Sequence, residues 1–214
     1  MPQQPHLFET ETARLGYLLH LPPGYKDESA EKWPLILFLH GKGERGDDLE
    51  LVKKHGIARI VEEQPEFPFI AVSPQCPDTS WWTEEVETLK ALLDFILAAY
   101  AVDRKRVYLT GLSMGGYGAW ALGSAYPDLF AAVAPICGGG DTDKVCALKN
   151  TPVWTFHGDD DEVVPFSETA NMVQALSACN GKVTMTIYKD VGHDSWTETY
   201  ANPELYKWFL SHSL

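Results

Sequence analysis

The chain has 214 residues, 45% of them hydrophobic and 12% aromatic, which is enough for one well-buried core in a single domain over residues 1–214. Seventeen basic and thirty acidic residues give a formal net charge of −13, which argues against nucleic acid and anionic membrane surfaces as partners. No apolar stretch approaches the roughly 20 residues needed to span a bilayer.

The chain alternates predicted strands with predicted helices. Polar–apolar alternation predicts a half-exposed strand over 13–21, and a continuous apolar run predicts a buried strand over 34–40. The other expected elements are a helix near 49–63, strand 68–73, helix 84–100, strand 106–110, helix 116–125, strands 130–136 and 152–156, helix 166–179, strand 183–188 and a helix from Pro203. This order predicts a mostly parallel central sheet with helices on both faces, and no insertion is long enough for a large lid.

One serine lies on a tight turn between a strand and a helix. Gly111-Leu112-Ser113-Met114-Gly115 follows the strand 106–110 and precedes the small-residue helix 116–125. A strand that turns sharply into a helix forces its central residue into strained backbone angles, and the flanking glycines relieve the crowding. Ser113 is therefore a candidate nucleophile, exposed where helix N–H groups can stabilise an oxyanion.

A nucleophilic serine needs a base, and three histidines follow Ser113 in the sequence. His212 lies on a polar tail and is expected to be solvated. His157 ends the strand 152–156 and is expected to pack against the following turn. His193 lies in a glycine-bearing loop after the strand 183–188, where a catalytic base belongs in an open α/β sheet, so it is the predicted base.

The acid that orients the base should follow the strand 152–156. The run from Asp159 to Glu162 offers four carboxylates there, and composition alone does not choose among them. Asp161 comes just before residues 163–165, which are expected to anchor the loop. It is therefore the first choice, with Asp160 second.

These segments resemble α/β-hydrolases of the carboxylesterase, phospholipase and dienelactone-hydrolase-like group, with feruloyl-esterase and polymer-depolymerase relatives. The resemblance rests on residues 39–46, the turn 111–118, the H-G-x-x-D-x-x-V-P pattern of 157–165, and Gly192-His193. It implies an α/β-hydrolase fold, and it selects Asp161, three residues after the H-G pair, as the acid. The resemblance also implies an oxyanion hole formed by the backbone amides of Lys42 and Met114.

The loop after the strand 34–40 carries glycines that let the backbone pass close to Ser113. Within it, Glu44 and Arg45 either form an ion pair that rigidifies the loop or face water, and a structural role is favoured. Aromatic side chains in other loops are candidate substrate-binding residues: Trp81, Trp82 and Trp196. Core packing is the alternative interpretation of these tryptophans.

Four cysteines, at positions 76, 137, 146 and 179, lack metal-ligand spacing, so no metal and no cofactor is expected. A bridge between Cys137 and Cys146 is one option, but reduced thiols are preferred. Residues 1–6 lack the basic and apolar parts of a signal peptide, which favours a cytoplasmic location unless a leader was removed.

The sequence thus predicts a serine carboxylesterase that acts on small-molecule esters with short-chain or aryl groups. Feruloyl or acetyl-sugar esterase and polyester depolymerase are alternatives that the sequence does not separate. An oligopeptide hydrolase would use the same residues, but it usually needs a gating domain that this length excludes. A non-catalytic binding protein is disfavoured because it has no need for all three predicted catalytic groups.

Overall fold

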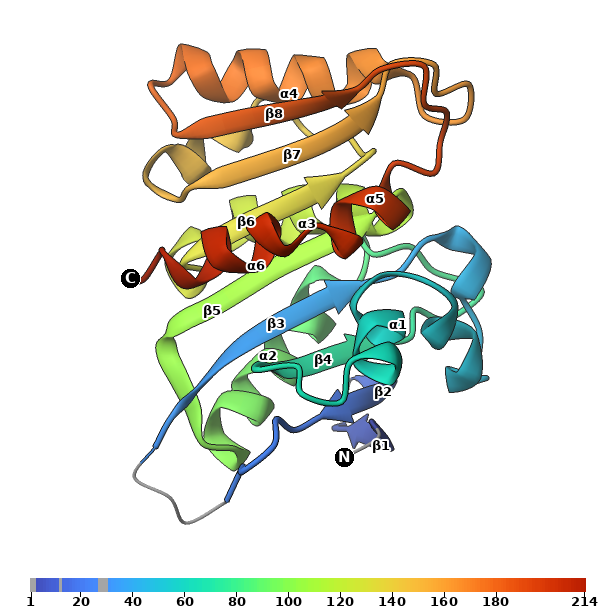
Figure 1. Ribbon diagram of the computed structural model, residues 1–214, viewed down its shortest axis with the longest axis vertical. Coiled ribbons are helices and arrows are strands. Elements are labelled where there is room, and N and C mark those ends of the chain that lie inside the picture. Colours follow the sequence, from blue (N-terminus) through green and yellow to red (C-terminus); the bar gives the residue numbers. More distant parts are fainter. Residues whose placement is uncertain (1–2, 12, 27–30) are drawn as a thin grey trace.

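The computed structural model describes residues 3–11, 13–26 and 31–214. One eight-stranded sheet runs through the described chain in the order β1-β2-β4-β3-β5-β6-β7-β8 (Figure 1). Strand β2 pairs antiparallel with β1 on one side and with β4 on the other. All the other neighbouring strands, from β4 to β8 along the sheet, pair in parallel. The predicted mostly parallel sheet is confirmed.

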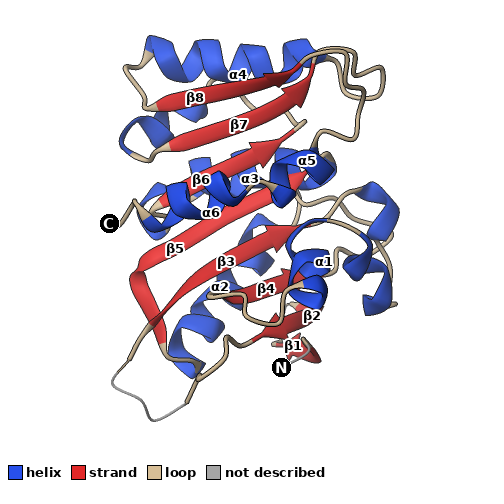
Figure 2. Ribbon diagram, viewed as in Figure 1, coloured by secondary structure: helices blue, strands red, loops and turns tan. Residues whose placement is uncertain are grey.

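The strands and helices alternate along the chain as Figure 2 shows. The strands are β1 Gln4–Glu9, β2 Arg14–His20, β3 Trp33–Leu39, β4 Ile70–Pro74, β5 Val102–Leu112, β6 Ala132–Ile136, β7 Val153–Gly158 and β8 Val183–Tyr188. The helices are α1 Gly56–Glu63, α2 Val86–Ala99, α3 Met114–Ala125, α4 Phe166–Ala178, α5 Trp196–Ala201 and α6 Pro203–Leu210, with 3₁₀ helices at Lys42–Glu44, Leu49–Lys54, Pro127–Leu129 and Val145–Asn150.

Two apolar clusters, one on each face, bury the sheet. Leu35, Leu37 and Leu39 of β3 belong to the cluster covered by α2, α3 and α4. Ile36 and Phe38 belong to the cluster covered by α1, α5 and α6. All five side chains are fully buried, as the continuous apolar run of this strand predicts. Helices therefore cover both faces, and among the described residues none forms a separate lid domain.

The order of the strands determines where a ligand-binding site is expected along the edge of the sheet. Strand β3 pairs with β4 on one side and with β5 on the other, so the chain reverses its direction of travel across the sheet at β3. In open α/β sheets ligands bind at such a switch point, beyond the carboxyl ends of the strands. The segments after β3 and after β5 both leave the sheet there, and they carry the glycine loop and Ser113.

The main differences from the predicted elements lie in three places. Strand β1 is absent from the predicted elements, and it pairs with β2 along the edge of the sheet. The helix expected near 49–63 is two helices, because His55 is extended and Gly56 has a φ of +64°. The short helix α5 precedes the predicted terminal helix. In the part of the chain that is described, no helix is both long enough and apolar enough to cross a membrane.

The cysteine pairing also differs from the expected one. Cys146 forms a disulfide with Cys179, across a Cα–Cα distance of 5.7 Å, whereas Cys137 is free and buried, as is Cys76. Cys137 belongs to the apolar cluster on one face of the sheet, whereas Cys146 lies on the 3₁₀ helix Val145–Asn150, whose buried Val145 and Leu148 belong to the cluster on the other face. Cys146 instead lies beside the carboxyl end of α4. The preferred reduced state of the thiols is therefore wrong, and the optional Cys137–Cys146 bridge is absent, while the cytoplasmic location stays a prediction.

The disulfide predicts how many cysteine thiols an alkylating reagent can modify. Alkylation of the urea-unfolded protein without reductant should modify two thiols, those of Cys76 and Cys137, and reduction should raise the number to four. The paired change Cys146→Ser and Cys179→Ser should lower the free energy of unfolding by about 4 kcal/mol, because the bridge closes a loop of 33 residues. Modification of Cys146 or Cys179 before reduction would contradict this pairing.

Candidate active site

Ser113 lies on a strained turn at the carboxyl end of β5, directly before α3. Its φ of +53° and ψ of −116° are sparsely populated for a residue with a side chain. Its amide donates to the Ile136 carbonyl at 2.9 Å, which ties the turn to β6. The turn predicted from the glycine pattern is therefore present, and it holds the serine at the switch point of the sheet.

The two glycines that flank Ser113 are required by close backbone contacts. A Cβ on Gly115 would lie 1.9 Å from the carbonyl oxygen of Leu39 in β3, and a Cβ on Gly111 would lie 2.2 Å from the carbonyl oxygen of Gly115. Neither position has room for any side chain. The start of α3 can therefore approach the end of β3 only with this sequence.

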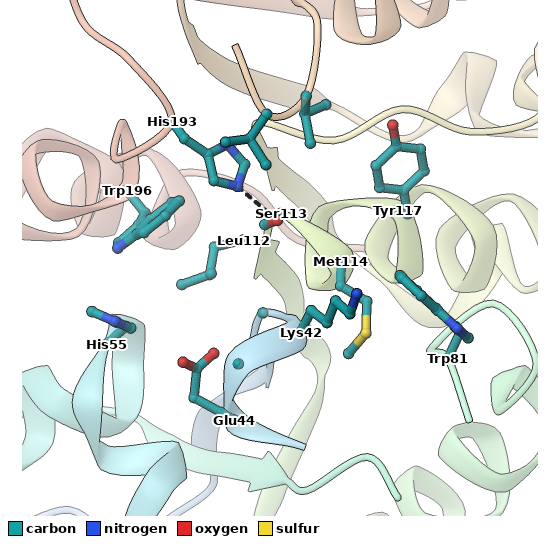
Figure 3. Close-up of a pocket in the computed structure, with 14 residues that line it drawn as sticks. Lys42, Glu44, His55, Trp81, Leu112, Ser113, Met114, Tyr117, His193 and Trp196 are labelled. Carbon is teal, nitrogen blue, oxygen red and sulfur yellow. Dashed lines mark hydrogen bonds between the residues drawn. The ribbon is translucent and has the colours of Figure 1, made fainter. Parts of the chain in front are cut away.

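His193 and Asp161 converge on Ser113. The His193 Nε2 atom lies 2.9 Å from Ser113 Oγ, and its Nδ1 atom lies 2.7 Å from Asp161 Oδ2 (Figure 3 shows the first contact). These three side chains come from the loops after β5, β7 and β8. The structure thus brings together the three residues predicted from the sequence as nucleophile, base and acid.

Burial distinguishes Asp161 from the other three acidic residues that follow β7. Only Asp161 is buried, whereas Asp159, Asp160 and Glu162 are exposed. Asp161 Oδ1 accepts hydrogen bonds from the amides of Val163 and Val164, both at 2.9 Å. Burial raises the pKa of this carboxyl, but the hydrogen bonds from His193 and from the two amides outweigh it, so the net pKa is lowered. The carboxylate is therefore held ionised opposite His193.

The other two histidines occupy structural positions. His157 is fully buried beside the acid, with Nδ1 2.7 Å from Thr169 Oγ1 and Nε2 3.2 Å from Asp161 Oδ2. It packs against the turn as expected and also contacts the acid. His212 is half-buried against the Trp208 ring rather than solvated, and its expected exposure is wrong. Neither histidine contacts Ser113.

His40 holds the glycine loop in place, a role that sequence reasoning missed. Its Nδ1 donates to the Gly41 carbonyl at 2.6 Å, and its Nε2 accepts from the Cys76 amide at 3.0 Å. The indole N–H of Trp82 donates to the His40 carbonyl at 2.9 Å. Because an amide N–H can only donate, Nε2 must be unprotonated, and the imidazole is neutral. The only sequence signal for this role was the position of His40 at the end of a buried strand.

A cavity of about 450 Å³ opens over Ser113. Trp81 and Trp196 line it, as do Lys42 and Met114, whose amides are the predicted oxyanion hole. Each of these two amides belongs to the first residue of a helix, where an N–H has no acceptor within the helix. Trp196 also contacts the His193 ring, with a centroid distance of 5.1 Å.

Trp82 does not line this cavity, although it borders a smaller hollow of about 140 Å³ that shares Trp81, Met114 and Tyr117 with it. Its side chain has no exposed surface and is part of the core. The centre of its ring lies 5.0 Å from the centre of the His40 ring. Adjacent tryptophans in one loop look alike in sequence, but only Trp81 faces outward. The cavity also has lining residues that were not predicted, namely Glu44, His55, Leu112, Tyr117, Val163 and Val164. Of these, only Tyr117 had a usable signal, because it lies one helical turn after Ser113.

Three potential metal-ligand atoms also meet here. One ligand atom each from Cys137, Asp161 and His193 lie within 4.8 Å of one another. Both ring nitrogens of His193 are already within hydrogen-bond distance of Ser113 and Asp161. A metal ion bound by His193 would have to displace one of these contacts, so the donor set fits the hydrogen-bonded arrangement better.

A mostly parallel sheet with a serine on a strand–turn–helix at its switch point, and with acid and histidine on later loops, defines the α/β-hydrolase fold. A model of the phospholipase/carboxylesterase family matches residues 67–203. The chain belongs to this family.

Comparison with known proteins agrees with this assignment. The chain is 33% identical to a thermostable esterase of known crystal structure, with a TM-score of 0.87, and the match covers 100% of this chain and 64% of that one. It is 30% identical over 168 residues to the "Putative esterase NocK" of Nocardia uniformis subsp. tsuyamanensis, which covers 71% of this chain and 46% of that protein. It is 27% identical over 157 residues to poly(3-hydroxyalkanoate) depolymerase C of Paucimonas lemoignei, which covers 69% of this chain and 36% of that protein. The chain therefore spans less than two thirds of the length of each of these relatives.

The neutral His40 ring predicts a specific loss of stability in acid. Burial lowers the pKa of His40 from its ordinary 6.5 to about 4, with the Gly41 carbonyl opposing and the Arg45 charge adding to the shift. Between these two pKa values the unfolded chain binds a proton that the folded chain does not. The contribution of His40 to the free energy of unfolding is therefore complete above pH 6.5 and falls by about 3 kcal/mol as the pH decreases to 4.

The measurement is urea denaturation of the wild type and of His40→Gln at pH 7 and at pH 4.5. The variant should be less stable at pH 7, because the Cys76 amide loses its imidazole acceptor. It should lose less stability than the wild type on acidification, because glutamine takes up no proton. Equal losses in the two proteins would contradict the neutral, buried state of His40.

Proposed function

We propose that this chain is a serine carboxylesterase that hydrolyses short-chain or aryl carboxylic esters through an acyl-enzyme intermediate. The observation that carries the proposal is the continuous hydrogen-bonded series from Ser113 Oγ through His193 to Asp161, at the base of an open cavity. A serine hydroxyl with an oriented base is an activated nucleophile. The family membership and the esterase relatives support this chemistry.

In the first half-reaction, Ser113 Oγ forms a bond to the carbonyl carbon of the ester while His193 Nε2 takes the hydroxyl proton. Asp161 accepts the His193 Nδ1–H and stabilises the imidazolium that forms. The amides of Lys42 and Met114 donate to the oxyanion of the tetrahedral intermediate. The intermediate then breaks its bond to the alcohol oxygen, which takes the proton from His193 and leaves, and the acyl group remains on Ser113.

In the second half-reaction, His193 takes a proton from a water molecule as the water oxygen attacks the acyl carbon. The resulting tetrahedral intermediate breaks its bond to Ser113 Oγ, which takes the proton from His193, and the carboxylic acid leaves. The same histidine, acid and oxyanion donors act in both halves. Because the oxyanion donors are backbone amides, a change of the Lys42 side chain alone does not remove them.

The substrate class is proposed from the cavity and the relatives. The side chains of Trp81, Met114 and Trp196 give the cavity apolar walls on both sides of Ser113, which suits small acyl or aryl groups. Relatives named as a feruloyl esterase, an acetylxylan esterase and a poly(3-hydroxyalkanoate) depolymerase make aryl, acetyl-sugar and polyester substrates the alternatives. An oligopeptide substrate has weaker support, since none of these three relatives is named as a peptidase.

Removal of the nucleophile tests the proposal. Ser113→Ala should lower kcat/KM for p-nitrophenyl acetate by at least about four orders of magnitude, because the remaining groups cannot form the acyl-enzyme. Thermal unfolding should show that the variant is folded, and a chelator should leave wild-type activity intact. Undiminished turnover by a pure variant would refute the assignment, and chelator loss restored by zinc would indicate a metallohydrolase.

The assignment of Asp161 as the acid is tested by the same substitution at Asp161 and at the neighbouring Asp160. Asp161→Asn should lower kcat by about three to four orders of magnitude, because the amide can no longer hold the imidazole in the required tautomer. Asp160→Asn, at an exposed position one residue away, should leave kcat nearly unchanged. Steady-state kinetics with p-nitrophenyl acetate gives both values, and damage at Asp160 with a tolerant Asp161 would show that the acid is misassigned.

A further inference from the structure

The carboxylate of Glu44 faces the catalytic cavity from the glycine loop. Glu44 ends the 3₁₀ helix Lys42–Glu44, is only 6% exposed, and lines the same cavity as Ser113. In Figure 3 its two oxygens lie on the side of the residue toward Leu112 and Ser113. Of the two arrangements considered for this residue in the sequence, the ion pair with Arg45 is absent, and the carboxylate faces the cavity.

The Glu44 carboxylate lacks a donor from the protein. Its main chain is fixed, since its carbonyl accepts from Gln75 Nε2 at 2.8 Å. Arg45 donates instead to the carbonyls of Lys42 and Ser80, and its guanidinium lies 5.1 Å from the centre of the Trp81 ring. Among the described residues, none forms a side-chain hydrogen bond or ion pair with either Glu44 oxygen. The carboxylate therefore faces the cavity with its acceptor positions unused by the protein, and a bound ligand that supplies hydrogen-bond donors can occupy them.

The carboxylate is close to the reacting atoms. A Cβ built on Gly41 would lie 3.1 Å from Glu44 Oε2 and 3.8 Å from Ser113 Cβ. Glu44 Oε2 therefore lies within about 7 Å of Ser113 Cβ. A substrate whose carbonyl carbon is at Ser113 has its neighbouring atoms within reach of Glu44.

The alcohol portion of an ester is the part that meets Glu44. The leaving oxygen must be within hydrogen-bond reach of His193 Nε2, which returns the proton. Trp196 contacts His193, and His55 contacts Trp196 with a ring-centroid distance of 5.7 Å. Figure 3 shows His55, Trp196 and Glu44 on one side of the cavity, and Trp81 and Tyr117 on the other. The side with Glu44 therefore receives the alcohol, and the opposite side receives the acyl group.

Building on the proposed esterase function, we propose that Glu44 is a specificity-determining residue that accepts hydrogen bonds from hydroxyl groups of the alcohol portion, so that esters of polyhydric alcohols are preferred. His55 is the second polar contact on this side. An imidazole offers both a donor and an acceptor, which matches hydroxyl groups, whereas an ammonium group can only donate. The cations near the cavity, Lys42 and Arg45, both lie over Trp81 on the acyl side.

The test compares two acetates that differ only in hydroxyl groups, namely glycerol 1-acetate and propyl acetate. The readout is the ratio of their kcat/KM values. The wild type should prefer glycerol 1-acetate by about tenfold or more, because its hydroxyl groups can donate to the Glu44 carboxylate whereas propyl acetate has no donor to offer. In Glu44→Leu the ratio should fall toward one, and in Glu44→Gln, which keeps an acceptor without the charge, it should lie between.

Two controls distinguish a hydroxyl preference at Glu44 from a general effect of charge and from cation binding. Glu66→Leu removes the same charge from an exposed position that does not line the cavity, and its ratio should equal that of the wild type. Acetylcholine and its uncharged isostere 3,3-dimethylbutyl acetate measure any preference for a cation. Thermal unfolding of each variant confirms that it is folded, and a ratio of two rates is insensitive to the amount of active protein.

A wild-type ratio near one, or a ratio that Glu44→Leu leaves unchanged, would overturn the assignment of Glu44 while leaving the esterase function standing. A larger preference for acetylcholine over its isostere, lost in Glu44→Leu, would replace the hydroxyl site by a cation site and also overturn it. If the wild type hydrolyses none of the four acetates nor p-nitrophenyl acetate, the proposed function fails and Glu44 has no substrate to select.

Discussion

The contact between the start of α3 and the end of β3 is the constraint on which the site depends. The Leu39 carbonyl lies where any side chain at position 115 would have to be, and Ser113, two residues earlier, has a positive φ. Strain of this kind persists only where the surroundings over-determine it, and here β3 and β6 do so through backbone packing and the Ser113–Ile136 hydrogen bond. The close approach places the serine beside the glycine loop, so the nucleophile, the proposed oxyanion donors and Glu44 share one cavity.

Features that depend on residues close together in the sequence could be predicted from the sequence alone. The strained turn at Ser113 needs glycines two residues either side, and these are visible in the sequence. The buried strand β3 shows as an unbroken apolar run, and parallel pairing follows from alternation with helices. The loop positions of His193 and Asp161 follow from the strands before them. For Asp161 the residues alone left Asp160 open, and burial with two amide donors distinguishes the two.

Features that depend on long-range packing were not predictable in the same way. Trp81 and Trp82 are neighbours in one loop, and only the position of the His40 carbonyl decides that Trp82 turns inward. Cys146 and Cys179 are 33 residues apart and meet because α4 packs beside the segment 145–150. Glu44 faces the cavity because Arg45 binds two carbonyls and Trp81 rather than its neighbour. Strand β1 has a largely exposed face, so its pairing with β2 left little apolar pattern to detect.

The central claim is that Ser113 becomes covalently acylated during turnover, and trapping that species tests it most directly. The protein would be mixed with p-nitrophenyl acetate, quenched in acid within the first turnovers, and digested for mass spectrometry. The proposed mechanism predicts one acetyl group per chain on the peptide that contains Ser113, and none when His193 is replaced by alanine. Rapid ester hydrolysis in a burst-resolved experiment with no acyl group on Ser113, or with the group on another residue, would contradict it.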